Sequence, residues 1–388
     1  MTRRVIFLFA LAILLAACTP SFKVQELAKV NELKQPGIVY ALPRTVVHID
    51  VEATQTTVRP GPFYLFADKL LGQQNVPVTE IIQWKIKDIH ISVSAEPDTA
   101  HYFLMTAKPQ EALNRINLSP DGILLGINTT QAGEIQLKKT QPAHGPTPSH
   151  QLADYASLSP TANLTEKVDT VYVGSGIDTL FLKIPSLRKQ VVEKSIGEKA
   201  QQAADFIYKL RRERYALLYG DKQVSNGTAM KTMLHKLDEL EQQYLSLFVG
   251  YTLKETKHFH FEFRPAEGGD IAQELLFRFS ETRGVMPASS KIGTPVFIDS
   301  RKMGLTSPIP HYKQRLEQFE AEGNGLVVRF PEKALLRVLS NRKEIARQQL
   351  PVAQYGELVR MPGALLQSGT SLKLYKNTGA LQYARPVN

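Results

Sequence analysis

The sequence predicts an α+β protein with a β-rich N-terminal domain, an antiparallel helical hairpin and a C-terminal β-sandwich or small barrel. Apolar and polar residues alternate over Thr45–Thr57 and again over Lys257–Arg264, with the period of two that a half-buried strand requires. Between these stretches, apolar residues recur at three- and four-residue steps, which indicates amphipathic helices. The chain has 388 residues, 43% of them hydrophobic, and is long enough for two or three domains with a sizeable core.

Residues 1–17 are predicted to be a signal peptide and not part of the fold. Arg3 and Arg4 supply a positive start, and the apolar run Val5–Leu15 is too short to cross a hydrocarbon layer of about 30 Å as a helix. The run ends in Leu15-Ala16-Ala17-Cys18, which resembles the lipobox of bacterial lipoproteins. Cys18 is the single cysteine of the chain, so we expect it to carry the lipid. The alternative is an ordinary secretory signal with a chance cysteine.

The residues after Cys18 predict where the anchored protein resides. Thr19 stands where an aspartate would signal retention at an inner membrane, and residues 19–23 contain no acidic cluster of the kind that sends some lipoproteins to the cell surface. We therefore expect an outer-membrane protein that faces the periplasm and contacts the membrane through acyl chains such as palmitate on Cys18.

Composition divides the mature chain into five segments. Residues 18–36 are expected to be a tether, and 37–137 the N-terminal β-rich domain. Residues 138–165 contain several prolines and few strong apolar residues, which favours a linker or, alternatively, a long loop inside one domain. Residues 166–250 are expected to hold a β-hairpin and the helical hairpin, and 251–388 the C-terminal β domain.

The helical hairpin is the clearest local prediction. Val168–Val173 and Asp178–Ile184 are expected to pair as strands around Gly174-Ser175-Gly176. The first helix is then expected over Ser186–Gly220, and the second after the cap-type residues that begin at Ser225. A short joint between two helices favours an antiparallel pair, and we interpret both apolar stripes as packing faces.

One strand carries residues that could bind a metal. His258, His260 and Glu262 share a face of the strand Lys257–Arg264, and two histidines with a carboxylate can hold zinc. The same alternation also predicts a solvated polar face opposite a phenylalanine core, and we favour that interpretation. We predict no metal, no cofactor and no catalytic residue, because the sequence has no phosphate-binding loop, dinucleotide fingerprint or His-Glu-x-x-His motif.

Arg211, Arg212 and Arg214 form a basic stretch late in the first predicted helix. They are candidates for contact with anionic lipid headgroups or an acidic glycan. The competing interpretation is favourable charge near a helix C-terminus on a solvated face. The formal net charge of +10 does not favour a nucleic-acid partner, because an exported lipoprotein does not meet nucleic acid.

Several short segments, taken together, match the sequence pattern of a known family. Among them are Gly37–Thr45, Arg59–Tyr64, Ala203–Arg211 and Val359–Gly363. This pattern resembles a family of uncharacterised bacterial envelope lipoproteins, classed as a domain of unknown function. The resemblance covers most of the mature chain and implies no activity, ligand or catalytic residue.

These observations predict a lipid-anchored, non-catalytic binding or assembly component of the cell envelope that contacts another envelope protein. One alternative is a glycan- or lipid-binding protein, which a shallow groove of tyrosines and basic residues would favour. A second alternative is a hydrolase whose catalytic residues are far apart in the sequence and come together only in the folded protein. An exposed apolar patch would favour the assembly role.

Overall fold

The computed structural model describes residues 21–29, 36–108, 113, 115–129, 163–177, 180–219, 227–268, 273–304, 325–362 and 370–386. The protein is β-rich, with 59% of residues in strands and few helices, which confirms the broad α+β class. Its strands form several antiparallel sheets, and those described close into no barrel. Residues 1–20, including Cys18, and 138–162 of the expected linker lie outside the described residues.

The chain forms two compact units. The first contains residues 1–53, 86–143 and 257–388, and the second contains 54–85 and 144–256. The boundaries fall inside three strands: β2 (Ile38–Arg59), β3 (Ile81–Lys108) and β8 (Tyr251–Phe263). The units are therefore not consecutive stretches of chain, unlike the linear domain order that composition suggested.

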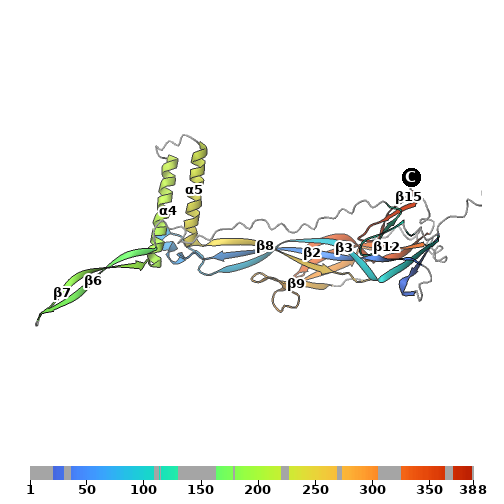
Figure 1. Ribbon diagram of the computed structural model, residues 1–388, viewed down its shortest axis with the longest axis horizontal. Coiled ribbons are helices and arrows are strands. Elements are labelled where there is room, and N and C mark those ends of the chain that lie inside the picture. Colours follow the sequence, from blue (N-terminus) through green and yellow to red (C-terminus); the bar gives the residue numbers. More distant parts are fainter. Residues whose placement is uncertain are drawn as a thin grey trace, which may run out of the picture. The chain divides into compact units, whose positions relative to one another are not determined.

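The first sheet has the order β1-β3-β2-β8 (Figure 1). Its edge strand β1 (Ser21–Glu26) pairs antiparallel with β3. These residues lie in the segment expected to be a tether, but Phe22 and Val24 are buried in the core, which explains why they are ordered as a strand. A 3₁₀ turn, η1 (Leu27–Lys29), follows.

The C-terminal strands, together with β4 and β5 from the N-terminal half of the chain, form two further sheets. One has the order β10-β9-β11-β12-β13 and the other β15-β14-β5-β4. Their bounds are β4 (Ile116–Leu118), β5 (Leu124–Ile127), β9 (Glu274–Ser280), β10 (Gly284–Pro287), β11 (Thr294–Lys302), β12 (Gly325–Ser340), β13 (Lys343–Pro362), β14 (Thr370–Leu374) and β15 (Leu381–Pro386).

One apolar core of the first unit combines strands from both ends of the chain. Val47, Ile49 and Val51 of β2, which the alternation placed on one face, are fully buried. They share one apolar cluster with residues of β9, β11 and β12, including Phe277 and Ile298. Segments 37–137 and 251–388, expected as separate domains, therefore contribute to a common core.

Proline does not end the long strand β12. The sequence pattern predicts two short strands, Gly325–Phe330 and Lys333–Ser340, with Pro331 between them, but the structure has one strand with a register shift between Phe330 and Glu332. On the partner strand the same shift falls between Val352 and Glu357, so residues 353–356 bulge out of the ladder. Gly356 is required there, because a Cβ atom would lie 1.5 Å from the carbonyl oxygen of Phe330.

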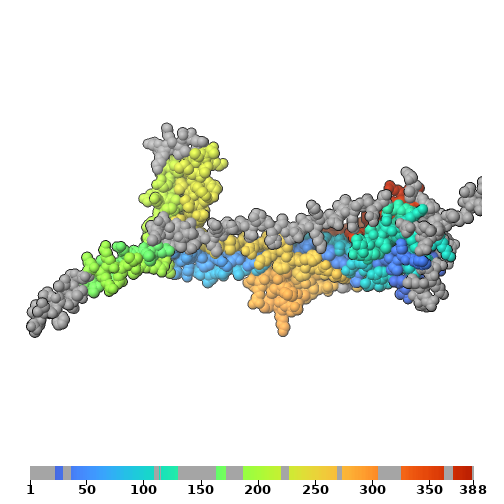
Figure 2. Space-filling view, viewed as in Figure 1, coloured from blue at the N-terminus to red at the C-terminus, as the bar shows by residue number. Residues whose placement is uncertain are grey.

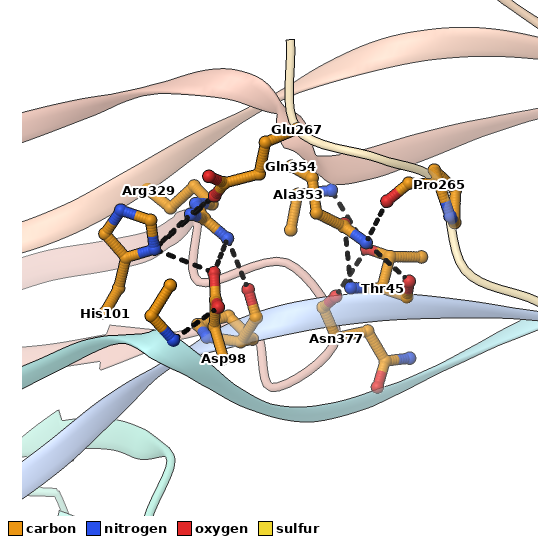
Figure 3. Close-up of polar contacts among 11 residues, drawn as sticks. Thr45, Asp98, His101, Pro265, Glu267, Arg329, Ala353, Gln354 and Asn377 are labelled. Atoms are coloured by element: carbon orange, nitrogen blue, oxygen red, sulfur yellow. Dashed lines mark hydrogen bonds and ion pairs between the residues drawn. The ribbon is translucent and has the colours of Figure 1, made fainter. Parts of the chain in front are cut away.

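The bulge connects β13 to β2 through side chains. Gln354 accepts a hydrogen bond from the Thr45 backbone N–H (2.9 Å) and donates one to its carbonyl oxygen (2.8 Å) (Figure 3). Thr45 Oγ1 in turn accepts from the N–H of Ala353 at 2.9 Å. The glutamine amide thus satisfies buried backbone groups of β2 as a neighbouring strand would.

In the second unit, β6 (Leu164–Ile177) and β7 (Leu180–Glu193) form a two-stranded ribbon, and α4 (Ile196–Tyr219) and α5 (Gly227–Val249) form the expected hairpin. The predicted start of the first helix at Ser186 is wrong, because β7 continues to Glu193. The predicted turn at Gly174–Gly176 is also wrong, because the paired strands continue to Ile177 and Leu180. Helix α4 begins after Ser195, whose N–H and hydroxyl both contact the Glu198 carboxylate in a capping box.

A short helical segment packs against the hairpin within the same unit. It consists of the 3₁₀ turn η2 (Tyr64–Phe66) and α2 (Ala67–Leu71), and it ends at Gly72 as predicted. Phe63 and Ala67 share an apolar cluster with Ala203 of α4 and Phe248 of α5. The apolar stripes predicted from the sequence are packing faces over residues 200–210 of α4 and 244–248 of α5, whereas Ile196 and Met233 of these stripes are exposed.

A buried ion cluster lies beside the β12 bulge. The Arg329 guanidinium donates to Asp98 Oδ2 (2.9 Å), to Glu267 Oε1 (2.7 Å) and to the carbonyl oxygen of Pro43 (3.1 Å) (Figure 3). His101 also contacts Asp98, at 3.0 Å. Burial alone would raise the pKa of Asp98, but the hydrogen bonds from Ala100 and His101 and the charge of Arg329 outweigh it and lower the pKa.

Replacing Arg329 should destabilise the first unit strongly. Arg329→Met leaves the Asp98 carboxylate, which is 3% exposed, without its cation, and we expect a loss of about 3–5 kcal/mol in the free energy of unfolding. Urea unfolding followed by far-UV circular dichroism measures it. Arg347→Met is the matched control, because Arg347 pairs with Glu344 on the surface and should cost about 1 kcal/mol or less. Equal losses would show that the buried cluster has no special role.

Candidate functional site

The three arginines singled out from the sequence all lie on α4, but they have different surroundings. Arg211 Nε lies 2.7 Å from Glu241 Oε1 of α5, and Arg214 Nη1 lies 2.9 Å from the other oxygen of the same carboxylate. Arg214 also contacts Asp238 at 2.6 Å, which raises the pKa of its guanidinium. Arg211 and Arg214 therefore connect the two helices. Arg212 is exposed and makes no ion pair within the described part of the chain.

Arg212 belongs to an exposed stripe on the outer side of α4. Tyr208, Arg212, Tyr215 and Tyr219 follow one another at three- and four-residue steps, so they lie on one face of the helix. An open groove of about 660 Å³ is lined by Asp205, Tyr208, Arg211, Arg212 and Tyr215. We call this surface the α4 groove. Figure 2 shows the surface of the hairpin in green and yellow-green.

Contacts within the unit hold two side chains of the α4 groove, Tyr208 and Arg211, in place. The hydroxyl of Tyr208 donates to the carbonyl oxygen of Leu70 in α2 at 2.9 Å. The Arg211 guanidinium lies 5.8 Å from the centre of the Tyr208 ring and donates a hydrogen bond to the Glu241 carboxylate. The rings of Tyr215 and Tyr219 lie 4.9 Å apart. The groove is thus preformed, which reduces the entropy lost when a partner binds.

The ribbon in the same unit also exposes apolar side chains. Both of its strands contribute: Leu164, Val168, Val171, Leu187 and Val191. A two-stranded ribbon is marginally stable by itself, and exposed apolar residues on it are typical of a surface that another chain covers. This surface and the α4 groove are the exposed features of the second unit that suit a binding role.

The histidines on β8 acquire a partner that sequence spacing did not reveal. His260 and Glu262 lie beside His48 of β2, and ligand atoms of these three residues all lie within 4.8 Å of one another. His258, which shared their face in the sequence pattern, instead lies 3.7 Å from Glu52. His48 stands at an outward position of the β2 alternation, but no local spacing connects it with residues more than two hundred positions later.

A second group with metal-ligand chemistry is the set Asp98, His101 and Glu267, of which Asp98 is buried, His101 is half-buried and Glu267 is exposed. The Arg329 guanidinium contacts all three side chains and supplies their positive charge. This cluster is therefore structural. In the first cluster, the carboxyl group of Glu262 is exposed, and the hydrogen bond from Arg264 lowers its pKa and keeps it ionised.

Within the described ranges, none of the helices combines the length and apolar character needed to cross a bilayer.

Comparisons with known proteins give a family but no activity. A family model described as a domain of unknown function (DUF4831) matches residues 36–168 and 188–382. The matched segments contain α4 and α5, and the interval between them falls on the ribbon. Neither the curated proteins nor the solved structures include a match to the chain. This protein, whose matched segments contain both its buried ion cluster and its α4 groove, belongs to the DUF4831 family.

Proposed function

We propose that the protein is a lipid-anchored, non-catalytic binding or assembly component of the bacterial cell envelope, and that the α4 groove binds an acidic segment of another envelope protein. The observation that carries the proposal is the exposed row of tyrosines around Arg212. The anchor is the lipid on Cys18, and the protein resides at the outer membrane, facing the periplasm.

The residue types in the groove support a protein partner. Tyrosine and arginine are enriched among the residues that dominate protein–protein binding energy, because they combine a large contact area with directed hydrogen bonds. The side chain of Tyr215 is 67% exposed and that of Tyr219 is 76% exposed, so their rings are available for contact. The guanidinium of Arg212 can form a bidentate pair with a carboxylate, which favours an acidic segment.

The ribbon favours protein over glycan as the partner. Its exposed leucine and valine side chains, together with Leu218 on α4, provide apolar surface that a glycan would not use. A groove of tyrosines and arginines would also suit an anionic glycan or lipid headgroup, which remains the alternative function. A hydrolase is the third hypothesis.

Charge reversal in the groove should weaken partner binding. We expect Arg212→Glu to reduce the protein that co-purifies from native envelopes in mild detergent by roughly 10-fold or more, because a carboxylate would repel an acidic segment. Quantitative mass spectrometry of the co-purified proteins measures the change. Lys231→Glu is the matched control, since it makes the same charge reversal at an exposed position of α5 that does not line the groove.

The outcomes separate the three hypotheses. Loss of a stoichiometric protein with Arg212→Glu, but not with Lys231→Glu, supports the assembly role. Retained glycan or lipid without any protein would contradict it and support the alternative. If nothing co-purifies, the assembly role fails and the purified protein should be screened for hydrolysis.

Removing the lipidated cysteine should release the protein from the membrane. In Cys18→Ala we expect the chain to lose incorporation of radiolabelled palmitate and to move from the outer-membrane fraction to the soluble fraction, because no acyl chain remains to bury in the bilayer. Cell fractionation with immunoblotting measures the shift. A variant that stays in the outer-membrane fraction would show that something other than the lipid retains the protein.

A further inference from the structure

We propose that His48, His260 and Glu262 form a binding site for a divalent transition-metal ion of the zinc class on the outer face of the first sheet. The three residues belong to the first unit and come from β2 and β8. The site is distinct from the α4 groove, so it neither requires nor tests the proposed binding function.

The distances between the ligand atoms suit one metal ion. His48 Nδ1 lies 3.2 Å from His260 Nε2. In a tetrahedral site with zinc–nitrogen bonds of about 2.0–2.1 Å, the two nitrogens are roughly 3.3–3.4 Å apart. Glu262 Oε1 lies 3.9 Å from the His48 nitrogen and 3.8 Å from the His260 nitrogen. A small rotation of this exposed carboxylate would bring the third ligand into place.

Second contacts orient both imidazole rings toward this point. Asp50 Oδ1 lies 2.7 Å from His260 Nδ1 and accepts its N–H, which directs the Nε2 lone pair toward His48. Ser94 Oγ lies 2.6 Å from His48 Nε2, and when it accepts that N–H the Nδ1 lone pair faces His260. A carboxylate or hydroxyl that holds the far nitrogen of a histidine is the usual outer shell of a metal site.

The carboxylate is held in a similar way. Arg264 Nη2 lies 2.9 Å from Glu262 Oε2, the oxygen that does not face the histidines. Arg264 is itself held by Glu96, with Nε to Oε1 at 3.1 Å. Each of the three ligands therefore has one atom within the cluster and a second atom engaged elsewhere.

At 3.2 Å the facing nitrogens of His48 and His260 are within hydrogen-bond distance, and a metal ion that replaces the shared proton would be bound by both nitrogens and by the Glu262 carboxylate. In the buried cluster of this protein, Arg329 supplies a cation to a histidine and two carboxylates. Two nitrogens and one oxygen are a borderline donor set that suits zinc and its neighbours better than magnesium or calcium. Three protein ligands leave a fourth position that faces solvent, because His260 and Glu262 are both exposed.

The first test is metal binding by the full-length protein in detergent micelles after removal of metals with a chelator. Zn²⁺ is added in competition with a chromophoric chelator, and we expect one tight site per chain. His48→Ala and His260→Ala should each weaken the affinity by more than the roughly 10–100-fold expected for Asp50→Asn, which removes only an outer-shell contact. Mg²⁺ and Ca²⁺ should not compete.

His258→Ala is the matched control, because His258 is an exposed histidine on the same strand and face but outside the cluster. It should leave Zn²⁺ affinity unchanged within about threefold, a margin below the outer-shell effect. The visible spectrum of bound Co²⁺ provides a second measurement, and it should be lost with His260→Ala and retained with His258→Ala. Thermal unfolding of each variant in the presence of chelator shows whether it remains folded.

Two results would overturn the proposal. One is a wild-type protein that binds no stoichiometric Zn²⁺. The other is an equal loss of affinity with His258→Ala and His260→Ala, which would indicate adventitious binding by surface histidines.

Discussion

The buried guanidinium of Arg329 is the contact on which the first unit most depends. It joins β12 to a carbonyl oxygen of β2, to Asp98 of β3 and to Glu267 in the turn after β8. The cost of burying a charge is offset only when every partner is in place, so these segments must be positioned together. The neighbouring bulge of β13 adds neutral hydrogen bonds from Gln354 to Thr45 of β2. Charged and neutral polar contacts thus fix strands whose apolar packing alone would permit sliding.

The local patterns of the sequence predict much of this fold, but its long-range pairing is not visible in them. Alternation correctly assigned the buried face of β2, and three-to-four spacing correctly assigned the packing faces of α4 and α5. Proline misled the prediction of strand ends, since Pro331 lies in a bulge that Gly356 on the facing strand accommodates. The capping box at Ser195 was a readable signal for the start of α4, and the apolar residues upstream of it belong to a strand.

The candidate sites were likewise only partly predictable from the sequence. The sequence located the basic stretch of α4, and only the fold shows that Glu241 engages Arg211 and Arg214 while Arg212 faces solvent. The sequence also placed His260 and Glu262 on one face, but the third ligand, His48, comes from a strand far away in the chain. A site assembled across strands depends on register, which no single segment encodes.

The two histidine–carboxylate clusters of the first unit show how burial decides the kind of cation. At Asp98 the surroundings exclude water, and a side-chain cation tethered to β12 provides permanent charge without an exchangeable ligand. At His260 the ligands are exposed, so an ion can enter from solvent and leave again. A buried guanidinium suits a fixed structural contact, whereas open imidazoles suit a reversible one. The same residue types therefore serve stability in one place and, on our proposal, metal binding in the other.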